Sequence, residues 1–113
     1  MREFINPGDL FDRLKAAWGP ESSGSWSVEN PAKGHCSATS LVIHDAFGGS
    51  ILKTHTPGGT HFYNMVDGVR WDMTVSRFDR PIPFADLPSS REEALADATP
   101  ARYEALKARM ALR

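Results

Sequence analysis

The fold is decided by residues 30–47, NPAKGHCSATSLVIHDAF, where a loop passes into an apolar helical pattern that begins near Cys36. Apolar residues recur at helical spacing along one side of this stretch and extend onto the next side. The pattern predicts a central, largely buried helix from His35 or Cys36 to Phe47. Gly48-Gly49 would close it with residues that tolerate a left-handed backbone.

Cys36 is the one cysteine of the chain, and it falls at the start of this predicted helix. Unpaired backbone N–H groups and the positive end of the helix dipole favour the thiolate, which is the nucleophilic form. The alternative is structural, because buried cysteines usually behave as small hydrophobic groups. A single cysteine excludes an intramolecular disulfide, and the sequence has no CxxC pattern for zinc.

Composition narrows the class of protein. The chain has 113 residues, of which 41% are hydrophobic and 24% charged, and its formal net charge is -1. The composition is typical of a soluble globular protein. The length is sufficient for a single hydrophobic core, so we expect one domain over residues 1–113. The charge gives no basic surface for nucleic acid, and no apolar run is long enough for a signal peptide or membrane span. We therefore expect a cytoplasmic protein that binds neither nucleic acid nor membrane.

An antiparallel sheet is expected after the central helix, with further helices at both ends of the chain. Asp67-Gly68 is a strong signal for a two-residue hairpin turn. Residues 80–88 hold three prolines and predict an irregular crossing. The other expected elements are a helix over Pro7 to Trp18, strands over Ser50 to Thr56, Thr60 to Val66 and Val69 to Thr74, and helices over Arg91 to Asp97 and from Thr99-Pro100 to the C-terminus.

The hairpin register predicts which residues share a face. If Val66 pairs with Val69, then Tyr63 lies opposite Asp72 and His61 opposite Thr74. Alternation gives two sets of side chains. The expected core face holds Phe62, Asn64, Val66, Val69, Trp71 and Met73, and the expected polar face holds His61, Tyr63, Met65, Arg70, Asp72 and Thr74.

On the polar face, His61 and Asp72 are diagonal neighbours, close enough for a side-chain hydrogen bond. A helix-start cysteine, a histidine and a carboxylate give the order Cys36, His61, Asp72. In this arrangement the imidazole pairs with the thiolate and the carboxylate orients the imidazole. The alternatives are ordinary: His61 is a hydrogen-bonded strand histidine on a solvated face, and Asp72 pairs with Arg70 or caps a loop.

Other residues complete the candidate site. The Cys36 backbone N–H and the amide of Asn30 are expected to hold an oxyanion, although Asn30 before proline also suits a plain turn. Trp26 is expected to line the cleft, His35 to adjoin the nucleophile, and Tyr63 to share the polar face. The four histidines show no HxH or HxxxH spacing, so we expect no metal and no other cofactor.

Several short motifs together resemble those of the YunG-like family of small bacterial proteins, over about residues 14–108. The family is one of uncharacterised function. One departure is His35, where the family pattern leads us to expect glutamine. The motifs are WSVENPAKGHC at 26–36, FGGSILK at 47–53, HFYN at 61–64 with DG at 67–68, DMT at 72–74 and PSSREEA at 88–94.

The order of cysteine, histidine and carboxylate is also similar to the layout of papain-like and transglutaminase-like cysteine hydrolases. This likeness implies an α+β fold, in which a central helix starting at the cysteine packs on an antiparallel sheet of at least three strands between terminal helices. It further implies a cysteine-dependent amide hydrolase or acyltransferase that acts on a peptide, a glutamine or asparagine side chain, or a small amide. Peptidase, deamidase and transglutaminase-like reactions stay open, as does the oligomeric state. The alternative is a non-catalytic binding module that keeps the cleft and presents Trp26 with the loop 21–27.

Overall fold

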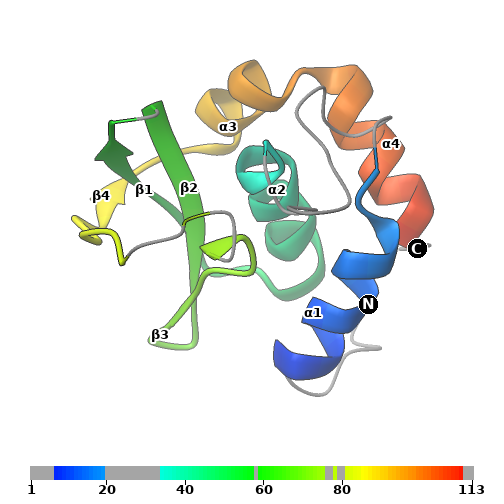
Figure 1. Ribbon diagram of the computed structural model, residues 1–113, viewed down its shortest axis with the longest axis horizontal. Helices are drawn as coiled ribbons and strands as arrows, with labels where there is room; N and C mark the ends of the chain where they lie inside the picture. Colours follow the sequence, from blue (N-terminus) through cyan, green and yellow to red (C-terminus); the bar gives the residue numbers. More distant parts are fainter. Residues whose placement is uncertain (1–6, 20–33, 58, 76–77, 79–80, 111–113) are drawn as a thin grey trace.

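The chain folds as an α+β protein, and the computed structural model describes residues 7–19, 34–57, 59–75, 78 and 81–110. This part contains four helices and one four-stranded antiparallel sheet of order β3-β2-β1-β4 (Figure 1). The expected fold class is confirmed at this level. The elements are α1 (Pro7–Ala17), α2 (Cys36–Phe47), β1 (Ser50–Thr56), β2 (Gly59–Val66), β3 (Val69–Trp71), β4 (Leu87–Pro88), α3 (Arg91–Ala98) and α4 (Pro100–Met110).

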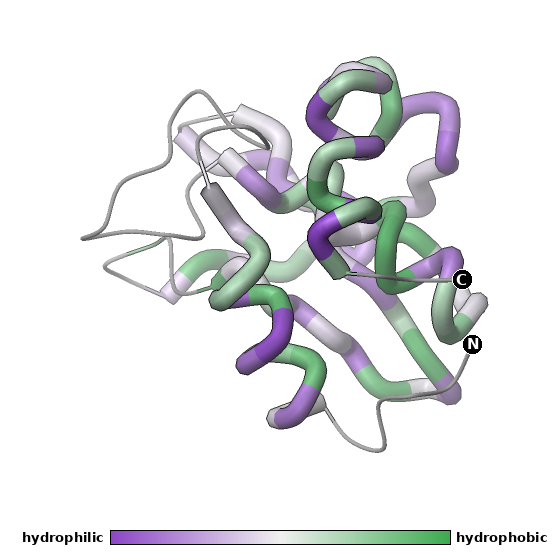
Figure 2. The backbone as a smooth tube through the Cα atoms, turned by 90° about the vertical axis from the view of Figure 1, so that its right-hand side faces the viewer, coloured by the Kyte–Doolittle hydropathy of each residue, from purple (hydrophilic) through white to green (hydrophobic). Residues whose placement is uncertain are grey.

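Helix α2 is the central element, as its apolar pattern predicts. It lies between the sheet on one side and α3 and α4 on the other, and α1 packs on α4 (Figure 1). Nine of its residues are buried, so nearly the whole circumference of the helix is covered. Figure 2 shows hydrophilic and hydrophobic residues interspersed along the backbone of the helices, as in helices that bury only part of their surface. Helix α2 differs from this pattern because most of its residues are buried.

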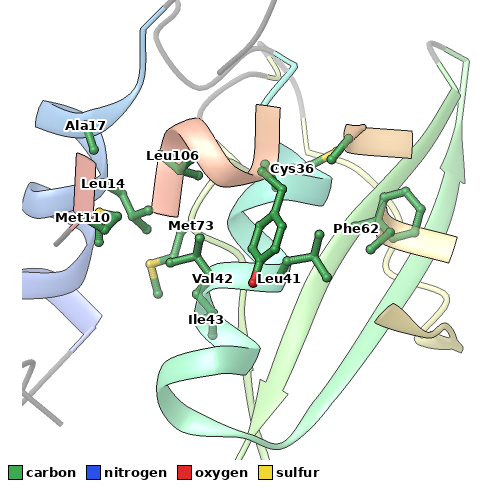
Figure 3. Close-up of a cluster of buried hydrophobic side chains, with 14 of the residues drawn as sticks. Leu14, Ala17, Cys36, Leu41, Val42, Ile43, Phe62, Met73, Leu106 and Met110 are labelled. Carbon is green, nitrogen blue, oxygen red and sulfur yellow. The ribbon is translucent and has the colours of Figure 1, made fainter. Parts of the chain in front are cut away.

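The hydrophobic core joins α2 to the helices and the sheet. Figure 3 shows Leu41 of α2 on the side of Phe62 of β2, Val42 and Ile43 of α2 on the side of Met73, and Leu106 contributed by α4. All of these side chains are buried. Cys36 belongs to the same cluster, so the thiol at the start of α2 lies at the junction of helix and sheet.

The two turns that flank β1 and β2 depend on backbone conformations with positive φ. Gly49 has φ +77°, and a Cβ atom there would lie 2.2 Å from the Met65 carbonyl oxygen. Asp67 and Gly68 have φ of 51° and 78°, as a two-residue type I′ turn requires. The predicted hairpin turn and the pairing of Val66 with Val69 are therefore confirmed.

Strand β3 ends at Trp71, three residues before the predicted end at Thr74. The Thr74 backbone N–H donates to the Asp72 carboxylate at 3.1 Å rather than to β2. The expected strand pairs Tyr63 with Asp72 and His61 with Thr74 were therefore wrong. The carboxylate replaces the sheet as the acceptor for this N–H group.

The predicted division into a core face and a polar face was only partly correct. Phe62 and Val66 are buried, but Val69 is 57% exposed because it lies at the turn of an edge strand. On the opposite face His61 and Tyr63 are also buried. Residues 81–86 cover this face: Thr54 Oγ1 donates to the Pro83 carbonyl at 2.9 Å, and Phe84 packs edge-on against the Tyr63 ring.

The stretch expected to be irregular, residues 80–88, ends in a short strand. In β4, Leu87 pairs with Lys53 and Pro88 with Leu52. A proline is tolerated there because β4 forms the edge of the sheet. Ser90 then caps α3 by accepting from the Glu93 backbone N–H at 3.1 Å.

Candidate functional site

His61 and Asp72 form a buried pair beside the start of α2. The His61 Nε2 atom lies 2.6 Å from Asp72 Oδ2, and the two side chains are 1% and 6% exposed. Strand β2 supplies the histidine, and Asp72 follows directly after β3. The hydrogen bond expected between these two residues is therefore present, although the strand pairing from which it was inferred is not.

The neighbours of His61 make it a cation at neutral pH. Burial alone would lower the pKa of His61, but the hydrogen bond to Asp72 and the nearby Cys36 side chain outweigh burial and raise the pKa to about 9. Asp72 and Cys36 are the ionisable groups that act on the ring. The three residues that the sequence singled out are thus brought together.

The two ring nitrogens of His61 have different surroundings. Nε2 is occupied by Asp72, whereas Nδ1 makes no hydrogen bond of ordinary geometry within the described part of the chain. The Asp72 bond fixes the ring in one orientation. Nδ1 is therefore the nitrogen available to a thiol or to a substrate.

Cys36 is the first residue of α2, and its side chain is 3% exposed. Its carbonyl accepts a hydrogen bond from Ser40 Oγ at 2.8 Å, which ties the second turn of the helix to the first. The preceding residue, His35, makes no side-chain capping bond to the helix.

His35 and Tyr63 have partners of their own. The His35 ring is fully buried and lies 5.6 Å from the Trp18 ring, centroid to centroid. Tyr63 stacks on His61 with centroids 6.0 Å apart, and its hydroxyl donates to Asp86 Oδ1 at 2.8 Å. Trp26 and Asn30, the two remaining candidates, lie outside the described residues.

Two sets of hydrogen bonds around the site residues were not predicted from the sequence. Asp86 accepts two hydrogen bonds from Arg70, at 3.1 and 2.7 Å, in addition to the Tyr63 hydroxyl. Asp72 Oδ1 accepts from both the backbone N–H and the hydroxyl of Thr74. No spacing rule links Asp86 to β2, but an aspartate two residues before a threonine is a recognised turn pattern that could have identified Thr74.

Other features lie apart from this group of residues. A pocket of about 310 Å³ is lined by residues of α2, β1 and the start of α3, and its lining includes neither Cys36 nor His61. Among the described residues, no three histidine, cysteine or acidic side chains are grouped to hold a metal ion. No helix of that same part is long and apolar enough to cross a membrane.

Comparison with known proteins gives a family but no reaction. The model of the YunG family, described as "YunG protein", matches residues 6–113. "Uncharacterized protein YunG" of Bacillus subtilis (strain 168) is 45% identical over 94 residues, covering 83% of this chain and 82% of that protein. No solved structure matches the chain, so the papain-like core expected from the sequence has no structural relative behind it. The match over nearly the whole chain shows that this protein belongs to the YunG family.

Proposed function

We propose that the protein is a cysteine-dependent amide hydrolase or acyltransferase with a papain-like or transglutaminase-like arrangement of Cys36, His61 and Asp72. The observation that carries the proposal is the buried pair of His61 and Asp72 beside Cys36, with Nε2 and Oδ2 2.6 Å apart. A histidine placed between a thiol and a carboxylate, with the start of a helix at the thiol, is the arrangement that activates a cysteine nucleophile.

In the proposed first step, the Cys36 thiolate attacks the carbonyl carbon of an amide and forms a tetrahedral intermediate. The His61 imidazolium gives its Nδ1 proton to the departing nitrogen, the C–N bond breaks, and a thioester forms. Because the pKa of His61 is raised to about 9, the proton needed by the leaving amine is present at neutral pH. Asp72 stabilises the cation and keeps Nδ1 directed away from the carboxylate.

In the second step, water or an amine attacks the thioester, and His61 accepts the proton of the attacking group. The C–S bond breaks, and the Cys36 thiolate is regenerated. Hydrolysis and acyl transfer differ only in this second nucleophile. The candidate substrates are accordingly a peptide bond, a glutamine or asparagine side chain, or a small amide.

The negative oxygen of the intermediate needs hydrogen-bond donors. The backbone N–H of Cys36, the first residue of α2, is the proposed main donor, because the first N–H groups of a helix have no acceptor within the helix itself. Asn30 stays a sequence-based candidate for a second donor. Tyr63, stacked on the His61 ring, supports the orientation of the imidazole.

One observation favours a second candidate function, a non-catalytic binding module. Cys36 is 3% exposed and lies in the hydrophobic core, as a structural cysteine does. Catalysis therefore requires the residues that cover the thiol to move when substrate enters. Thiol chemistry separates the two functions, because only the catalytic one needs a thiol that depends on His61.

Alkylation by iodoacetamide tests the proposal site-specifically, since the chain has a single cysteine. The wild-type protein, His61→Gln and the matched control His55→Gln would be compared at neutral pH. His55 is an exposed histidine of β1, and glutamine at position 61 keeps a donor for Asp72. We expect His61→Gln to react at least about tenfold more slowly than wild type, and His55→Gln to react at the wild-type rate. Equal alkylation rates of the three proteins in urea would show that the substitutions do not change the reactivity of Cys36 in the unfolded chain.

A second experiment tests for the thioester. Wild-type protein treated with p-nitrophenyl acetate should release one p-nitrophenolate per chain in a burst and gain one acetyl group by mass spectrometry. Cys36→Ala should show neither. Alkylation that is slow and independent of His61, together with the lack of a burst, would reject the catalytic function in favour of the binding module.

A further inference from the structure

Asp72 lies just beyond the end of β3, so no strand pairing fixes its position. Strand β3 ends at Trp71, and its last ladder pair joins Trp71 to Asn64. A carboxylate just past a strand end is free to rotate about its side-chain bonds unless other groups fix it. The short contact from Oδ2 to His61 therefore requires a further support.

Thr74 provides this support from two residues further along the chain. Its backbone N–H lies 3.1 Å from Asp72 Oδ1, and its hydroxyl lies 3.3 Å from the same oxygen. Thr74 is 1% exposed, so water cannot readily replace these donors. A side-chain oxygen that accepts from the backbone N–H two residues on forms an Asx turn.

The two oxygens of the carboxylate are thus assigned to different partners. Oδ1 is held by Thr74, which leaves Oδ2 directed at His61 Nε2. We propose that Thr74 is a positioning residue of the candidate site, whose hydroxyl is needed beside its backbone N–H to hold the Asp72 carboxylate with Oδ2 directed at His61. This inference rests on the proposed function, and it extends that function to a residue outside the three reacting groups.

The test separates the Thr74 hydroxyl from the rest of the side chain. Thr74→Val removes the hydroxyl donor and keeps the shape and the backbone N–H, whereas Thr74→Ser keeps the hydroxyl and removes the methyl group. Thr39→Val is the matched control, because Thr39 is also a buried threonine and accepts a hydrogen bond from Trp18 Nε1 at 3.0 Å. It removes a buried hydroxyl that has no bond to Asp72.

The main readout is the titration of the His61 ring by NMR in the full chain, which does not depend on any enzymatic activity. In Thr74→Val the pKa of His61 should fall from about 9 toward its ordinary value, because a mobile carboxylate is bonded to Nε2 for less of the time. Thr74→Ser and Thr39→Val should titrate as wild type does. The rate of Cys36 alkylation should fall several-fold in Thr74→Val alone.

The outcomes separate this inference from the proposed function. If Thr74→Val loses stability but His61 titrates as in wild type, Thr74 is only a packing residue and the inference is wrong. If the pKa of His61 falls in Thr74→Val but wild-type Cys36 forms no thioester, the positioning role stands and the catalytic function fails. Should Thr74→Ser lower the pKa of His61 as much as Thr74→Val does, the hydroxyl does not position Asp72, and the inference is again overturned.

Discussion

Two aspartates serve the same face of the hairpin, and their surroundings are opposite. Asp72 meets His61 with the two side chains 6% and 1% exposed, whereas Asp86 meets Arg70 with the two side chains 37% and 39% exposed. Both contacts are short, at 2.6 and 2.7 Å. Water competes for the exposed pair and is excluded from the buried one. The contact distance therefore does not show which pair is stronger. Because the Asp72 pair is buried, it has the larger effect on its partner, and it helps to raise the pKa of His61.

The largest expected effect comes from removing the buried carboxylate. Asp72→Ala leaves the His61 ring buried without its acceptor, so we expect the free energy of unfolding to fall by roughly 3 kcal/mol. Urea unfolding at neutral pH measures this change. Asp72→Asn, which retains an acceptor oxygen, should lose less. If Asp72→Ala lowers the free energy of unfolding no more than Asp9→Ala, which removes an exposed aspartate, burial does not distinguish the Asp72 pair from the exposed pair.

The second effect is a pH dependence of stability. The folded pKa of His61 is raised to about 9 from 6.5, so its stabilising contribution is complete below about pH 6.5 and disappears as the pH rises through about 9. The free energy of unfolding should decrease by up to about 3 kcal/mol over this interval. Urea titrations across the interval provide the measurement, and His61→Gln should lack this decrease. Parallel profiles for the two proteins would show that His61 is not the group responsible.

The smallest expected effect comes from the exposed pair. Side-chain hydrogen bonds to Arg70 and Tyr63 lower the pKa of Asp86, but the pair is open to solvent and should contribute little to stability. Arg70→Ala should shift the unfolding midpoint only slightly, and added salt should remove the difference from wild type. A large loss that persists in high salt would mean that the exposed pair anchors residues 81–86 more firmly than its exposure indicates.

The sequence predicted much of the fold because its signals are local. The apolar pattern of α2 and the Asp67-Gly68 turn each act within a short stretch of the chain. The end of β3 could not be predicted, because it depends on whether the Thr74 N–H donates to β2 or to the Asp72 side chain. The exposure of Val69 likewise follows from the place of β3 at the edge of the sheet.

The candidate site shows the same division between local and distant contacts. The alternation of side chains between the two faces of the hairpin was sufficient to place His61 near Asp72, even though the expected strand pairs are absent. Asp86 could not be placed, because it reaches Tyr63 and Arg70 from 23 and 16 residues away through a proline-rich crossing. Burial of the site was also missed, since residues 81–86 cover a face that the polar pattern alone would assign to solvent.

The central claim is that Cys36, His61 and Asp72 act as one unit, and the titration of His61 in wild type and in Cys36→Ala tests it most directly. NMR of the full chain reports the ring without any substrate. We predict that His61 of the wild-type protein titrates with a pKa of about 9 and that this pKa falls when the thiol is removed, because Cys36 contributes to the raised value. If the pKa of His61 in the wild-type protein is near its ordinary value, or if it is the same in Cys36→Ala, the three residues do not act as one unit.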